Sequence, residues 1–150
     1  MGSSVILYNK HYTYDKTLAI AVNKLDVNFT WSQTSFGVRT EQAGCALYLT
    51  LANRTKKMVE RIYVAGNCYL LDNDGNQYSS VDNNFYWMDG RSSSFNAHSS
   101  VLAPNARLQG FVLFPKLRSF QKFKRFFFKC EFWIDSEMHQ GNYDVELIWP

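Results

Sequence analysis

Alternation of apolar and polar residues with a period of two is the feature that most constrains how this chain folds. From Cys45 to Leu51 every second residue is apolar, while Tyr48 and Thr50 hold the other parity. Because successive side chains of a β-strand point to opposite faces, one face of this segment must be covered by a core. Three further segments alternate in the same way. Their predicted core-facing residues are Ile62, Val64, Cys68 and Leu70; Leu25, Val27, Phe29 and Trp31; and Tyr143, Val145, Leu147 and Trp149.

Two segments depart from simple alternation. Leu108 to Pro115 is apolar on both parities, which predicts a strand that is covered on both sides. Leu18 to Val22 is a predicted strand whose parity does not continue into the segment that begins at Leu25. The change falls at residues 23–24 and indicates either a turn or a β-bulge.

The stretch RFFFKCEFWID, residues 125–135, raises the question of function because it combines aromatic and basic side chains. Its even positions from 126 to 134 are all apolar, so half of these side chains belong to the inner face of a predicted strand. Phe127 and Trp133 fall on the outer face, where a core does not explain them.

The composition predicts one globular domain over residues 1–150, with residues 1–4 as an added leader or a disordered start. Charged residues are 19% of the 150, below the usual ~25%, and a chain of this length buries enough surface to need no metal or disulfide. The net charge of +3 permits an anionic partner without requiring one. No apolar run is long enough to span a membrane, and no signal peptide is visible.

Turn signals separate the predicted strands. Residues 72–76, Asp-Asn-Asp-Gly-Asn, predict a hairpin turn, because these residue types tolerate positive φ and bond their own backbone. Helix is expected to be minor, at most one turn near Leu117 to Lys124. Short strands between such turns are typical of an all-β sandwich.

The central part of the chain resembles the immunoglobulin-like modules of unknown function found on bacterial lipoproteins and secreted proteins. The likeness covers roughly residues 45–117 and lies in turn and strand motifs. The matching residues are Asn53, Asp72, Asp74, Gly75, Tyr78, Pro104, Gly110, Phe114 and Pro115. It implies an immunoglobulin-like antiparallel β-sandwich of about seven to nine strands, a binding or scaffolding role, and a place outside the cytoplasm. In that pattern one pair of cysteines can bridge the sheets, so Cys130 with Cys45 or Cys68 is a hypothesis.

Metal, cofactor and catalytic motifs do not emerge from the sequence. The turn at residues 72–75 hints at calcium, but an EF-hand alignment puts Leu70 and Val81 at ligand positions, and other ligands such as Asp82 and Asp89 are a weaker alternative to a backbone turn. The histidines are scattered without metal-ligand spacing. Ser99 and Ser100 neighbour His98, but there is no Gly-x-Ser-x-Gly elbow, and no nucleophile or acid–base pair can be named. We therefore expect no cofactor and no enzyme. Asn28 and Asn53 begin glycosylation sequons, which matter only in a eukaryotic secretory route.

A basic stretch is the first candidate surface. Its cations are Lys116, Arg118, Lys122, Lys124, Arg125 and Lys129, with no acidic residue among them. Cations with interleaved aromatics can hold nucleic acid or an anionic membrane. The alternative is a solvated loop between two strands, with lysines that protect a sheet edge.

An aromatic loop over residues 82–96 is the second candidate surface. It carries Phe85, Tyr86, Trp87 and Met88, residue types that are enriched in interface centres. The alternative is a lid that folds back over the core. The preferred interpretation is a non-enzymatic protein-binding or adaptor module that uses this loop, with Tyr86 and Trp87 as anchors. The other hypothesis is an electrostatic binder that uses residues 116–129.

Overall fold

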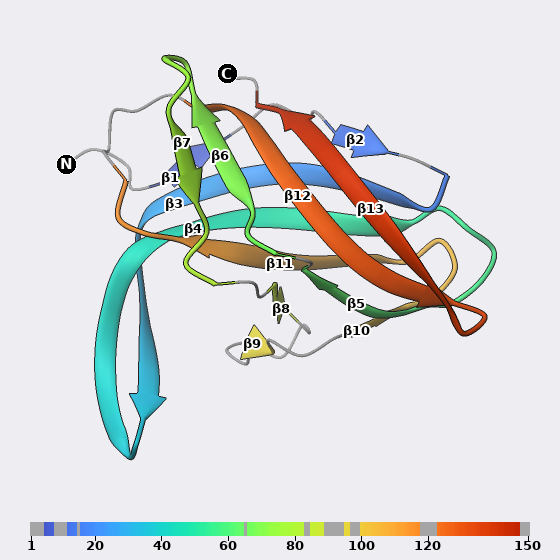
Figure 1. Ribbon diagram of the computed structural model, residues 1–150, viewed down its shortest axis with the longest axis horizontal. Coiled ribbons are helices and arrows are strands. Elements are labelled where there is room, and N and C mark those ends of the chain that lie inside the picture. The colour runs from blue at the N-terminus through green and yellow to red at the C-terminus, as the bar shows by residue number, and fades with distance from the viewer. Residues whose placement is uncertain are drawn as a thin grey trace.

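The computed structural model describes residues 5–7, 12–14, 16–64, 66–82, 85–88, 95–96, 100–117 and 123–147. This part of the chain forms thirteen strands and no helix, which confirms the predicted all-β class (Figure 1). The strands are β1 (Val5–Leu7), β2 (Tyr12–Tyr14), β3 (Leu18–Ser35), β4 (Val38–Asn53), β5 (Val59–Val64), β6 (Tyr69–Asp72), β7 (Gln77–Ser79), β8 (Tyr86–Met88), β9 (Phe95–Asn96), β10 (Ser100–Leu102), β11 (Arg107–Phe114), β12 (Phe123–Ile134) and β13 (Glu137–Glu146).

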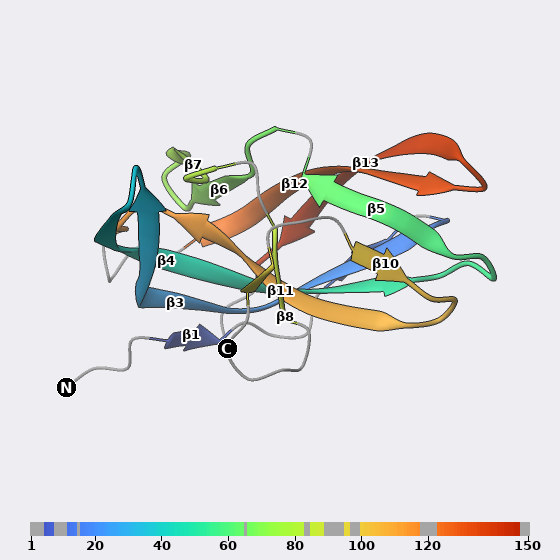
Figure 2. The same ribbon diagram turned by 90° about the horizontal axis from the view of Figure 1, so that it is seen from below.

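The strands form two antiparallel sheets. The first has the order β1-β3-β4-β11-β8-β9, with β2 also paired to β3. In the second, β12 is central: β13 lies along one edge, and β5 and β6 pair with successive parts of the other edge. Figure 2 shows the two sheets as stacked layers, with β3, β4 and β11 in one and β5, β6 and β12 in the other. The arrangement is a β-sandwich.

The core fills the space between the sheets and follows the predicted parities. Leu47, Leu49 and Leu51 of β4 are fully buried, and they face the phenylalanines of β12. Phe126 meets Phe114 of β11 edge to face, with ring centroids 6.4 Å apart. The even positions of RFFFKCEFWID are therefore core residues from Phe126 to Phe132, as predicted.

Strand β3 contains two bulges, of which one was predicted. The register shift between Val22 and Lys24 is a bulge, so β3 continues where a turn was the alternative. The second shift lies between Asp26 and Phe29 and reverses the parity again. Phe29 and Trp31 consequently lie on the opposite face from Leu25, so their assignment to the same core-facing set is wrong.

Strand β11 is covered on both faces, as its composition predicted. Val112 and Phe114 point into the core, whereas Phe111 and Leu113 point outward and are still only 1% exposed. A second, smaller cluster of partly buried side chains covers them. It consists of Phe29, Trp31, Tyr48 and Tyr86.

The predicted strand over residues 62–72 is divided into β5 and β6, and short strands bring the number above the expected seven to nine. The core-facing residues of this segment are nevertheless buried as predicted. Phe123 and Lys124 belong to β12, so they do not form the expected helical turn; residues 118–122 lie outside the described residues.

Two buried polar residues organise the turns. The Asp72 carboxylate accepts hydrogen bonds from the backbone N–H groups of Asp74 and Asn76 at 2.9 and 2.8 Å, which fixes the β6–β7 turn. Asn53, 2% exposed, donates its amide to the carbonyls of Lys57, Leu102 and Ala103. Asn53, the asparagine of the second sequon, is therefore buried and hydrogen-bonded, whereas Asn28, the asparagine of the first sequon, is exposed.

Candidate functional site

A protruding hairpin is the most distinctive surface feature, and the sequence reasoning missed it. Beyond the sandwich, β3 and β4 continue as a two-stranded ribbon, residues 30–43, which we call the arm (Figure 1). Apart from the intermediate Trp31 and Gln42, the side chains described along it are exposed. The ion pair of Arg39 with Glu41, at 3.7 Å, contains its only charged groups.

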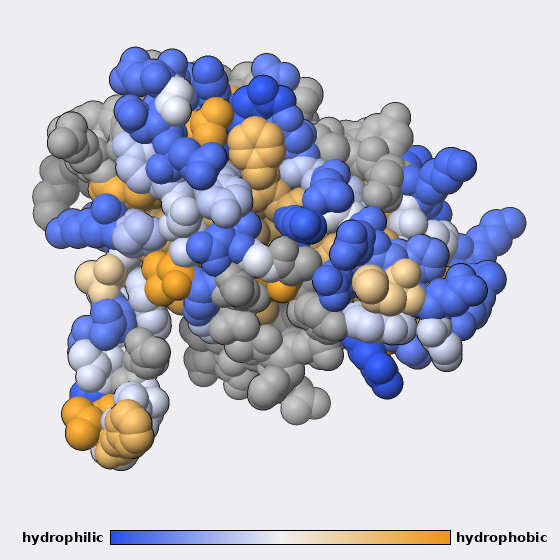
Figure 3. All heavy atoms as spheres, viewed as in Figure 1, coloured by the Kyte–Doolittle hydropathy of each residue, from blue (hydrophilic) through white to orange (hydrophobic). Residues whose placement is uncertain are grey.

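The tip of the arm is apolar. Phe36 and Gly37 form a two-residue turn with φ values of 51° and 77°. Phe36 has 103% of its reference area exposed and Val38 has 63%. In Figure 3 the end of the arm is orange, separated from the body by bluish polar atoms. A left-handed backbone at a residue other than glycine costs about 1–2 kcal/mol, so Phe36 is both strained and solvated.

A groove of about 490 Å³ lies at the base of the arm. Its volume lies within the range of ligand-binding clefts, and apolar side chains outnumber polar ones in its lining. We call it the arm-base groove. Nine residues line it: Phe29, Thr30, Trp31, Ser32, Val81, Asp82, Tyr86, Phe111 and Leu113.

Strand pairing and a bulge bring these residues together. Tyr86 of β8 pairs with Phe111 of β11, and their rings stack at 5.3 Å with 13° between the planes. The second bulge of β3 turns Phe29 toward the same ring, at 5.1 Å. Trp31 lies over Gly44, where an added Cβ would be only 3.1 Å from the indole. The groove therefore has a floor of aromatic rings packed against one another.

The structure divides the predicted aromatic loop. Phe85 is 3% exposed and packs edge to face against Phe128 at 6.0 Å, so it is a core residue, as the lid alternative expected. Tyr86 is half-buried, lines the groove, and donates its hydroxyl to the Asp82 carboxylate. The side chains of Trp87 and Met88 lie outside the described residues.

The structure describes the basic stretch only in part. Lys116, Lys124 and Lys129 are exposed, whereas Arg118 and Lys122 lie outside the described part of the chain. The Arg125 guanidinium pairs with the Asp144 carboxylate and lies 5.4 Å from the Phe127 ring. This contact accounts for Phe127 on the outer face, and Arg61 lies 5.9 Å from the Trp133 ring in the same way.

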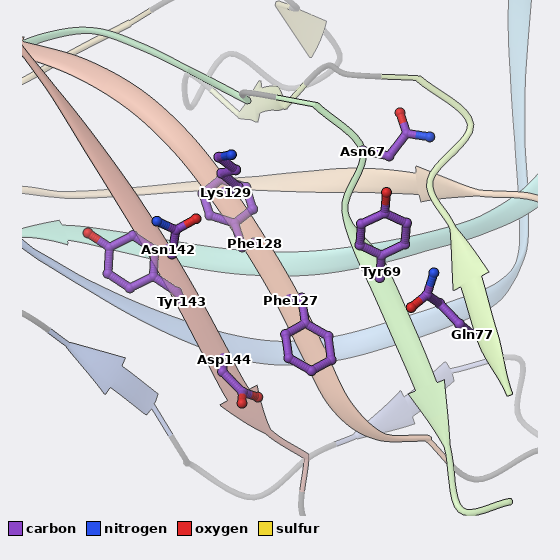
Figure 4. Close-up of a pocket in the computed structure, with 9 residues that line it drawn as sticks. All are labelled: Asn67, Tyr69, Gln77, Phe127, Phe128, Lys129, Asn142, Tyr143 and Asp144. Atoms are coloured by element: carbon purple, nitrogen blue, oxygen red, sulfur yellow. The ribbon is translucent and has the colours of Figure 1, made fainter. Parts of the chain in front are cut away.

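A second groove, of about 420 Å³, lies on the outer face of β12. Figure 4 shows Tyr69 and Phe127 side by side in it, with the amides of Asn67, Gln77 and Asn142 around them. Lys129 stands beside Asn142, its cross-strand partner. We call it the β12 groove.

The cysteines are buried free thiols, so neither hypothetical bridge of Cys130 is formed. Burial raises the pKa of the Cys68 thiol to about 12 and also raises the pKa of Cys45. A thiol whose pKa is raised is protonated and unreactive at neutral pH.

Metal-ligand groups do not cluster among the residues that the structure describes. In the turn at residues 72–76, which the sequence analysis considered for calcium, the Asp72 carboxylate accepts hydrogen bonds from backbone N–H groups of the turn. It also accepts one from the side-chain amide of Asn76 at 3.0 Å. Asp82 bonds Tyr86, and Asp89 lies outside the described part.

Comparison with known proteins gives no relative: no family model matches the chain, and no curated protein or solved structure is significantly similar to it. Within the described residues, no helix is long and apolar enough to cross a membrane.

Proposed function

We propose that the protein is a non-enzymatic binding module whose contact surface is the arm-base groove, and that its partner is a protein segment with a bulky apolar side chain. The observation that carries the proposal is the lining of the groove. Four aromatic rings and two aliphatic side chains surround a cavity that is open to solvent, with Thr30, Ser32 and Asp82 as its polar members.

The physical properties of the groove favour a protein partner. Aromatic side chains with few rotatable bonds lose little entropy when a partner packs against them, and they dominate the centres of protein interfaces. The Tyr86–Asp82 hydrogen bond and the stack on Phe111 hold the ring in place before binding. Beside the groove, the arm offers strand edges to which an extended segment can add backbone hydrogen bonds.

The proposal changes the role of the loop at residues 82–96. Tyr86 keeps its predicted role as an anchor, whereas Phe85 supports it from the core. The immunoglobulin-like assignment and the adaptor role also stay proposals, supported by the turn at Asp72 and by the motif that contains Gly110.

An anionic partner is a second proposal. It is supported by exposed Lys124 and Lys129 on a strand that also presents Phe127. Its weakness is Arg125, which Asp144 already neutralises. Replacement of Lys122, Lys124 and Arg125 by Glu should abolish binding of an oligonucleotide or of anionic liposomes at physiological salt. Equal binding by the native chain and this variant would dismiss the second proposal.

The test of the main proposal is selection of displayed peptides on the native chain. We expect the selected peptides to carry Phe, Trp or Leu. Val81→Glu places a charge in the groove at a side chain that is 49% exposed, so it should weaken these peptides at least tenfold without loss of stability. Gln77→Arg, in the β12 groove, is the matched control. Equal binding by the native and Val81→Glu chains would contradict the proposal.

A further inference from the structure

We infer that the segment that fills the arm-base groove is the arm tip of a second copy of this chain, so that two copies exchange their arms reciprocally. This inference rests on the proposed function, because it names the partner of the same groove.

The chemistry of the tip matches that of the groove. Phe36 and Val38 are large apolar side chains held away from the body, and exposed apolar groups of this kind gain stability when a partner covers them. The groove offers aromatic and aliphatic walls, and its 490 Å³ accommodates a small number of side chains. One molecule therefore carries both halves of an apolar contact.

The geometry of the arm places the two halves at opposite ends of one ribbon. Phe36 is at the tip, and Trp31 of the groove is at the base. At about 3.4 Å per residue the distance between them is on the order of 20 Å. When two arms lie side by side and antiparallel, each tip reaches the base of the other arm. The contact is then the same in both directions, as a two-fold dimer requires.

The edges and charges of the arm favour this arrangement. Within the described residues, β1 pairs with β3 only at Lys24–Asp26 and β11 pairs with β4 only from Cys45 onward, so the outer edges of the arm have no strand beside them. Proline and lysine, which commonly protect such edges, do not occur in residues 30–43. Because Arg39 and Glu41 balance, two arms approach without the repulsion that the net charge of +3 implies elsewhere.

Size also fits a dimer. Arm and groove together offer about twenty residues on each copy, at the lower end of the 20–30 per side found in specific interfaces. By contrast, a nucleic-acid wedge or a membrane anchor needs several cations beside its apolar residues, and the arm has Arg39 alone.

The test compares oligomeric state by sedimentation equilibrium for the native chain and three variants. Phe36→Asn removes the apolar tip and keeps the turn, since Asn-Gly is the preferred pair for this hairpin type. Val81→Glu blocks the groove. Met138→Thr is the matched control, because Met138 is 50% exposed next to the tip of the β12–β13 hairpin. We expect the first two variants to dissociate at least tenfold more readily than the native chain, and Met138→Thr to be unchanged.

A mixture of the two variants tests the reciprocal contact itself. Phe36→Asn retains an intact groove and Val81→Glu retains an intact tip, so the mixture forms a heterodimer through one contact at concentrations where each variant alone is monomeric. A contact between two tips predicts no such rescue. A native chain that stays monomeric at all concentrations, or a mixture without a heterodimer, would overturn the inference.

The outcome for the proposed function is separate. If displayed peptides bind the groove while Phe36→Asn leaves the oligomeric state unchanged, the groove is a binding site and its partner is another protein. If vesicles that contain phosphatidylserine bind a monomeric native chain but do not bind the Phe36→Asn variant, the tip is a membrane contact. Either result would rule out a second copy as the partner of the groove. If, in addition, no displayed peptide binds the groove, the proposed function is also ruled out.

Discussion

Replacement of Asn53 by alanine should destabilise the fold by several kcal/mol, because this buried side chain joins three segments of the chain. The Asn53 amide nitrogen reaches the carbonyls of Lys57, Leu102 and Ala103 at 2.7, 3.0 and 3.2 Å. Its oxygen accepts the N–H and the hydroxyl of Thr55, both at 2.8 Å. This one side chain therefore joins the end of β4 to the following loop and to β10.

The magnitude follows from the burial of each partner. The bond to Leu102 is buried, so its loss costs about 1–3 kcal/mol, whereas water can replace the partly exposed bonds at about 0.5–1 kcal/mol each. The sum over the one buried and four partly exposed bonds is about 3–7 kcal/mol, which for a domain of this size lowers Tm by roughly 6–28 °C. Asn53→Asp should cost at least as much, because a carboxylate would face the same carbonyls.

Urea unfolding followed by circular dichroism measures the difference in free energy, provided that the slope with urea is unchanged. Asn142→Ala is the matched control: an exposed asparagine whose loss should change stability by no more than about 0.5 kcal/mol. A loss of less than about 1 kcal/mol for Asn53→Ala would refute the reasoning, because it would mean that water or a small shift satisfies the carbonyls.

Two further predictions concern the core. Gly110→Ala should destabilise by about 1–3 kcal/mol in urea unfolding, because the added Cβ would lie 2.2 Å from the Phe85 ring; when it is combined with Phe85→Ala, the two costs should be less than additive, and strict additivity would exclude this clash. Stability in reducing buffer should fall above pH ~8.5, where the unfolded Cys68 thiol loses its proton while burial, which raises its pKa to about 12, keeps the folded thiol protonated. The free energy of unfolding should fall by up to ~1.4 kcal/mol per pH unit in this range. If a Cys68→Ala variant loses stability with pH as steeply as the native chain, the prediction is wrong.

Much of the fold could be predicted because burial imposes a period of two on a strand. The inner faces of β4 and β12 follow from this period alone. The prediction failed where a bulge changed the parity, at Asp26–Phe29. The sequence held a signal there, because Asp26 and Asn28 are residue types that favour local turns over strands. In the structure the Asn28 N–H donates a hydrogen bond to the Asp26 carboxylate at 3.0 Å, at the position of the bulge.

The candidate site could be predicted only in part. Tyr86 was singled out for its residue type, but the groove needs Phe29, Val81 and Leu113, which only strand pairing and the second bulge bring near it. The arm had a signal in Phe36-Gly37 between polar residues on both parities, since glycine in a two-residue loop is typical of a hairpin. Its protrusion could not be predicted, because that depends on where neighbouring strands end.

Methyl NMR of the protein labelled at valine and leucine tests the binding role of the arm-base groove most directly. The account predicts that a selected peptide shifts the methyl signals of Val81 and Leu113 and leaves Val101, an exposed valine on β10, unchanged. Shifts at Val101 with none at Val81 and Leu113 would contradict the account.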